Sequence, residues 1–191
     1  MGYILGAACG VVYNRRMEED LKYPVGKFAY EGFGDRVQRA EWIQEISHLP
    51  EKLKAAVQGL NDEQLDTPYR PEGWSVRQLV HHIADSHMNS FMRLRLALTE
   101  PEPTIKPYDE KTWAELPDSR ELPPNISLQL LEPLHLRWVH VLKSITEDDF
   151  ARCFRHPEMG SMSLDKATAL YAWHSRHHLA HITNLRKRMG W

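Results

Sequence analysis

Apolar residues recur every three or four positions in four long segments of the chain, with polar residues between them. This spacing places the apolar side chains on one face of an α-helix. The predicted helices cover about residues 35–60, 76–99, 128–145 and 164–189. No alternating strand pattern and no internal repeat stands out. The pattern therefore predicts an all-α four-helix bundle, with residues 100–125 as a long crossover connection between the second and third helices.

Several residues mark where these helices should begin or bend. Ser75 with Gln78 has the spacing of a capping box, which predicts that the second helix starts near Val76. Ser127 is the predicted N-cap of the third helix. Pro50 lies inside the first helical pattern, so this segment is either one kinked helix or two helices that abut there.

The connections carry weaker signals. Asn61 is a predicted N-cap for a short turn of helix, and Thr146 with Asp149 is predicted to cap another. A further helical turn is expected at residues 109–115, inside the proline-rich crossover. Residues 152–161 read as a loop that contains a small hairpin.

Four histidines are concentrated in the last predicted helix, at residues 174, 177, 178 and 181. Side chains four positions apart lie on the same helix face, so His174 with His178, and His177 with His181, could each bind one metal ion. His174 and His178 fall inside the apolar stripe of this helix, whereas His181 lies at its edge and His177 outside it. The alternative to a metal site is a pair of hydrogen-bonded core histidines.

A metal site needs at least one more ligand from elsewhere in the chain. His81, His82 and His87 on the second predicted helix are all candidates, and His135 on the third is a fallback. His87 lies on the apolar arc of its helix. His82 lies on a polar arc that periodicity alone predicts to be solvated. The pattern by itself does not choose among them.

The composition suits one globular domain. The 191 residues are 42% hydrophobic and 26% charged, with a formal net charge of −2, which disfavours nucleic acid as a partner. The two cysteines make neither a disulfide framework nor a cysteine-based zinc site, and a reducing cytoplasm is the expected location.

The first residues differ from the rest of the chain. The apolar run at residues 4–13 is too short to span a membrane, and no Lys or Arg precedes it as in a secretory signal. We expect residues 1–20 to be a disordered or mis-called N-terminal extension, with Met17 as an alternative start. The predicted domain covers residues 21–191.

Four stretches of the chain resemble a known family, at residues 64–70, 73–87, 104–110 and 171–182. They are similar to the YfiT-type metal-dependent hydrolases, which belong to the DinB superfamily of four-helix bundles. The resemblance extends over about residues 21–191.

This resemblance implies a metal site made of His82, His174 and His178. The resemblance and the helical pattern agree on His174 and His178. The resemblance adds His82, although periodicity alone predicts that this residue faces solvent. The implied cofactor is one divalent metal ion per subunit, zinc in the first place and nickel as the alternative. The resemblance also implies a cytoplasmic homodimer that acts on a small molecule, without nucleic acid or membrane as partner.

Three functions are compatible with such a site. Three neutral imidazoles leave coordination positions open, which is typical of a catalytic metal that activates water in a hydrolase. The same site could activate a thiolate in a bacillithiol-type S-transferase, or belong to a non-catalytic metal-binding stress protein. No general base is evident, although Asp85 could relay a proton. Arg137 and Arg176 could hold an anionic substrate.

Overall fold

The computed structural model describes residues 19–191, so the predicted extension at residues 1–20 lies almost entirely outside the described residues. Four long helices form the predicted bundle: α2 (Arg36–Val57), α4 (Val76–Thr99), α7 (Asn125–Ser144) and α9 (Leu164–Met189). Pro50 lies inside α2, which settles the first segment as a single helix. Within the described part of the chain, no helix has both the length and the apolar character needed to cross a membrane.

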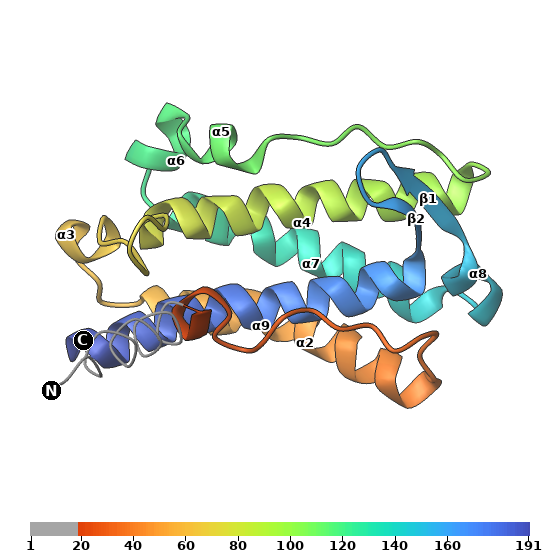
Figure 1. Cartoon of the computed structure of the whole chain (residues 1–191), viewed down its shortest axis with the longest axis horizontal. Coiled ribbons are helices and arrows are strands. Elements are labelled where there is room, and N and C mark those ends of the chain that lie inside the picture. The colour runs from red at the N-terminus through yellow and green to blue at the C-terminus, as the bar shows by residue number, and fades with distance from the viewer. Residues whose placement is uncertain (1–18) are drawn as a thin grey trace, which may run out of the picture.

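The long crossover determines the topology of the bundle. In Figure 1, α2 and α9 run from right to left, whereas α4 and α7 run from left to right. Helix α2 packs against α9 and α7, and α4 packs against the same two helices. Neighbouring helices α4 and α7 can be parallel because the chain returns along α4 between residues 100 and 124 before α7 begins.

Short elements occupy the connections: α3 (Asp62–Leu65), α5 (Glu110–Ala114), α6 (Pro117–Glu121), α8 (Glu147–Ala151), β1 (Cys153–His156) and β2 (Gly160–Ser163). The two strands form an antiparallel hairpin that pairs His156 with Gly160, which confirms the predicted hairpin. The helical turns expected near residues 61, 109 and 146 are also confirmed. Helix α6 was not predicted because its N-cap, Leu116, makes no side-chain capping bond.

One predicted boundary is wrong. Helix α7 begins at Asn125, after the N-cap residue Pro124, so Ser127 lies inside the helix and does not cap it. Proline is compatible with the start of a helix because it fixes a suitable φ and its missing N–H would be unpaired there anyway. The Ser127 hydroxyl contacts His81 of α4 instead. By contrast, the capping boxes at Ser75 and Thr146 both form as expected.

A polar band divides the interior of the bundle. One apolar cluster includes Phe91 and Trp138, and the other includes Ile83 and Ile182. Along α9, Tyr171 and Ala172 belong to the first cluster, whereas Ile182 and Leu185 belong to the second. The four histidines of α9 therefore lie between two apolar clusters, where burial of polar groups requires partners.

The segment that precedes α2 covers one side of α9. It runs along α9 and α2 in Figure 1. The indole Nε1 of Trp173 donates a hydrogen bond to the carbonyl oxygen of Gly26, at 3.0 Å. At the other end of the segment, the carboxylate of Asp165 accepts hydrogen bonds from Tyr30 and from the backbone N–H of Gly34. These contacts bury a face of α9 that the helix alone would expose.

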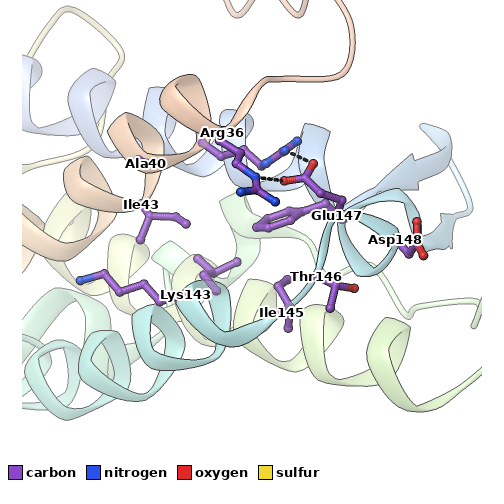
Figure 2. A pocket seen from close by; sticks show the side chains of 11 residues that line it. Arg36, Ala40, Ile43, Lys143, Ile145, Thr146, Glu147 and Asp148 are labelled. Carbon is purple, nitrogen blue, oxygen red and sulfur yellow. Dashed lines mark hydrogen bonds and ion pairs between the residues drawn. The ribbon is translucent and has the colours of Figure 1, made fainter.

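A surface pocket of about 540 Å³ lies where α2, α7 and α8 meet. Arg36 and Arg39 both pair there with Glu147 at the start of α8 (Figure 2). Arg39 also pairs with the buried Asp165, at 2.9 Å. These ion pairs join α2 to α8, and because no histidine lines the pocket, it is not the candidate metal centre.

Candidate metal centre

Three histidines from two helices converge in the polar band. His82 comes from α4, and His174 and His178 come from α9. The Nε2 atoms of His174 and His178 face each other at 3.1 Å, as their spacing of four residues on one helix allows. The ring centroid of His82 lies 5.5 Å from that of His174 and 5.0 Å from that of His178. One ring nitrogen from each residue lies within 4.8 Å of the other two, so the group could hold a metal ion.

Burial keeps these three imidazoles in the form that binds metal. Desolvation lowers the pKa of His82 to about 4, with a smaller contribution from the charge of His177. The same desolvation lowers the pKa of His174 and of His178 well below the ordinary value. Neutral rings carry a free lone pair, which a metal ligand requires. Three nitrogen donors also leave coordination positions open, so the donor set fits a divalent ion in a catalytic arrangement.

A cavity of about 440 Å³ opens onto the three histidines. Trp74 and Trp173 supply aromatic surface, and Tyr108 comes from the crossover. Arg93 of α4 and His156 of the hairpin also line the cavity. This volume lies within the usual range for small-molecule sites. The carboxylates of Glu110 and Glu158 line the cavity as well, so most of the residues around the histidines are polar.

A second histidine group competes with the first. His177, His178 and His181 also bring ring nitrogens within 4.8 Å, and the Nε2 atoms of His177 and His181 lie 3.1 Å apart. These three residues all come from α9, and Nε2 of His178 already faces His174. Desolvation lowers the pKa of His181 to about 3, and the charges of His177 and then of the two arginines Arg70 and Arg188 lower this pKa further. Their positive charge disfavours a cation at this group, so the first group is the better candidate.

Two predictions from helical periodicity are wrong. His177 was placed outside the buried stripe, yet it is 8% exposed, because Trp173 stacks on it at 4.5 Å and Tyr23 of the preceding segment lies nearby. His82 was assigned to a solvated arc, yet it is also 8% exposed, with the ring of Trp74 at 4.5 Å. Trp74, which precedes α4, covers His82, whereas Trp173 of the same helix and Tyr23 of the segment before α2 cover His177.

The other candidate ligands have hydrogen-bond partners within the bundle. Nε2 of His81 donates to the carbonyl oxygen of Leu122 at 3.0 Å, and its Nδ1 accepts from Ser127 at 2.8 Å. His135 bonds to the carbonyl oxygen of Ile46, and His87 lies between His135 and His174. None of the three belongs to either group that could hold a metal within the described residues.

The charged residues proposed for substrate chemistry lie elsewhere. Arg176 pairs with Glu45 at the surface, and Arg137 lies over the ring of Phe91. Asp85 is half-buried, and desolvation, followed by the charge of Asp118, raises its pKa to about 6. None of these candidates lines the cavity.

Arg93 does line the cavity, and the sequence reasoning missed it. The polar arc predicted on α4 comprises His82, Asp85, Ser86 and Asn89. One more helical turn along the same arc would have reached Arg93, because side chains four positions apart lie on the same face.

Comparison with known proteins identifies the family. The family model described as "DinB superfamily" matches residues 45–182. The chain belongs to the DinB superfamily. A Bacillus cereus (strain 03BB102) relative named "putative metal-dependent hydrolase" is 56% identical over 172 residues, which cover 90% of this chain and 99% of the relative. A Bacillus mycoides (strain KBAB4) relative with the same description is 54% identical over 173 residues, which cover 91% of this chain and 99% of the relative.

A solved structure supports the same assignment for this DinB-superfamily protein. YfiT from Bacillus subtilis, described as "a probable metal-dependent hydrolase with an unusual four-helix bundle topology", matches with a TM-score of 0.88 and 51% sequence identity. The match covers 90% of this chain and 99% of that chain. The resemblance to YfiT-type proteins and the bundle fold are therefore confirmed.

Proposed function

We propose that this DinB-superfamily protein is a metal-dependent hydrolase of a small-molecule substrate. In this proposal His82, His174 and His178 hold one divalent ion, zinc in the first place and nickel as the alternative. The observation that carries the proposal is the convergence of three neutral imidazoles from two helices at the wall of a cavity, with His82 and His178 buried and His174 partly buried. The names of the relatives support the same class of activity.

The remaining residues of the cavity bind and orient the substrate. A divalent ion supplies Lewis acidity when bound, which lowers the pKa of a coordinated water molecule or thiol. Trp74 and Trp173 pack against the apolar part of the substrate, and the half-buried Arg93 holds an anionic group. The crossover keeps Tyr108 in place, since its ring packs on Trp113 at 4.4 Å. It also limits the access of bulk water.

A thiol S-transferase is the second candidate. The cavity volume of about 440 Å³ is compatible with this activity, because that space accepts a low-molecular-weight thiol beside a small electrophile. The same three histidines would then hold a metal ion that would lower the pKa of a bound thiol in place of water. A cytoplasmic homodimer remains an expectation for either enzyme, and a metal-binding stress protein would share the site but show no turnover.

The test compares two reactions catalysed by one purified, metal-loaded protein. A panel of esters and amides is assayed beside bacillithiol mixed with a chloro-aromatic electrophile. We expect hydrolysis that is lost in His82→Ala and retained in His48→Ala, whose histidine is exposed on α2. Turnover only in the presence of thiol would contradict the hydrolase and support the S-transferase. No turnover in either reaction would contradict both enzymes and support the non-catalytic metal-binding stress protein.

A further inference from the structure

A chain of hydrogen bonds connects His174 to the opposite side of the bundle. Nδ1 of His174 lies 3.1 Å from Nε2 of His87, and Nδ1 of His87 lies 3.0 Å from Nε2 of His135. Nδ1 of His135 lies 2.7 Å from the carbonyl oxygen of Ile46 on α2. The chain therefore runs from α9 through α4 and α7 to α2.

The carbonyl at the end of this chain fixes the direction of every bond. A carbonyl oxygen only accepts, so Nδ1 of His135 carries a proton and donates to Ile46. Nε2 of a neutral His135 is then an acceptor, and Nδ1 of His87 donates to it. By the same step Nε2 of His87 accepts from Nδ1 of His174. Each junction has one donor and one acceptor, and no other arrangement of neutral rings satisfies all three bonds.

We infer that His87 and His135 are positioning residues that hold the His174 proton on Nδ1 and so direct the lone pair of Nε2 toward the metal. This inference rests on the proposed function, because it concerns the ligand set named there. The Nε2 atom left free by the chain is the one that faces His178 at 3.1 Å. Metal-binding histidines commonly donate their other N–H to a fixed acceptor, which sets both tautomer and ring orientation.

The surrounding packing leaves the middle rings little freedom to reorient. His87 is 0% exposed and His135 is 2% exposed. Their rings are nearly parallel, with an interplanar angle of 12°, which suits a hydrogen bond between ring nitrogens. Trp138 and Tyr171 meet His87 edge-on, with centroids at 5.5 and 5.3 Å. The chain is therefore enclosed by aromatic side chains rather than exposed to water.

Two substitutions of His87 test whether its hydrogen-bond acceptor, rather than its bulk, supports metal binding. His87→Leu removes the acceptor for His174, whereas His87→Gln can place an amide oxygen near the original Nε2 position and accept the same proton. We expect His87→Leu to weaken zinc binding by about 10- to 100-fold, which is typical when a residue that hydrogen-bonds to a metal ligand is lost. His87→Gln should recover most of the lost affinity. His81→Asn is the matched control, because His81 is buried on the same helix but bonds to Ser127 and Leu122.

The experiment measures ring tautomers by long-range ¹H–¹⁵N NMR in the metal-free protein, and zinc affinity by competition with a chelator. The inference predicts the Nδ1–H tautomer for His87, His135 and His174, and a loss of affinity in His87→Leu but not in His81→Asn. An Nε2–H tautomer for His174, or unchanged affinity in folded His87→Leu, would overturn it. If the tautomers are as predicted but wild-type protein binds no zinc, the proposed function fails while the hydrogen-bond chain stands.

Discussion

Replacement of Asp165 by alanine should strongly destabilise the protein. Asp165 is 0% exposed at the start of α9, where its carboxylate accepts hydrogen bonds from Tyr30 at 2.7 Å and Gly34 at 3.0 Å and pairs with Arg39 at 2.9 Å. Arg39 is 4% exposed. Removing one partner of a buried pair typically costs about 3–5 kcal/mol, because the other charge stays desolvated. Glu147 also pairs with Arg39 and should keep the loss near the lower end of that range.

Urea and thermal unfolding of metal-free protein measure this loss. For a chain of this size, 3–5 kcal/mol corresponds to a decrease in Tm of roughly 6–20 °C. Asp165→Asn should cost less than Asp165→Ala because an amide can still accept from Tyr30 or Gly34. Asp148→Asn is the control, since Asp148 is exposed in α8 and should change stability by less than about 0.5 kcal/mol. A loss below about 1 kcal/mol in Asp165→Ala would refute the reasoning that this carboxylate joins the preceding segment to α2 and α9.

Three further predictions concern the site and its surroundings. Burial lowers the pKa of both His82 and His135 to about 4, below the unfolded value of 6.5. Below about pH 6.5 the unfolded chain takes up a proton at each histidine that the folded protein does not bind until about pH 4. The free energy of unfolding should therefore be unaffected by these histidines above about pH 6.5 and should fall by about 1.4 kcal/mol per pH unit for each of them as the pH falls toward 4. Urea unfolding of metal-free protein between pH 7.5 and 4.5 should show this decrease, and a flat profile would contradict it. Asp85 has a raised pKa of about 6, so its ionisation destabilises the fold as the pH rises above the pKa of the unfolded chain, 3.8. Asp85→Asn should therefore be more stable than wild type by about 1–2 kcal/mol at pH 8, and this difference should vanish below pH 4. Arg93→Ala should reduce the preference for carboxylate-bearing over neutral substrates by about tenfold while metal content stays unchanged, and an unchanged preference would remove Arg93 from substrate binding.

Periodicity and capping signals predicted the four helices because each helix has an apolar face long enough to dominate its pattern. Helices α4 and α9 begin and end at the predicted residues, and the structure brings together His174 and His178 as the apolar stripe of α9 suggested. The start of α7 was misplaced because Pro124 provides no side-chain signal comparable to that of Ser127.

The rest of the candidate site depends on long-range contacts. A helical wheel assumes one buried face, but Trp173 and the segment before α2 together cover His177, and Trp74 packs over His82. The choice of His82 among the histidines of α4 therefore came from the resemblance and not from periodicity. The separate roles of His81 and His87 depend on partners in α7, on Leu122 and on His174, and no local pattern within α4 shows those partners.

Metal content of tag-free protein tests the central claim most directly. The measurement compares wild type with His82→Ala, His181→Ala and the exposed control His48→Ala by elemental analysis. The account predicts about one zinc or nickel ion per chain in wild type, in His181→Ala and in His48→Ala, and loss of the ion in His82→Ala. Retention of the ion in His82→Ala together with its loss in His181→Ala would place the metal at His177, His178 and His181 and contradict the account.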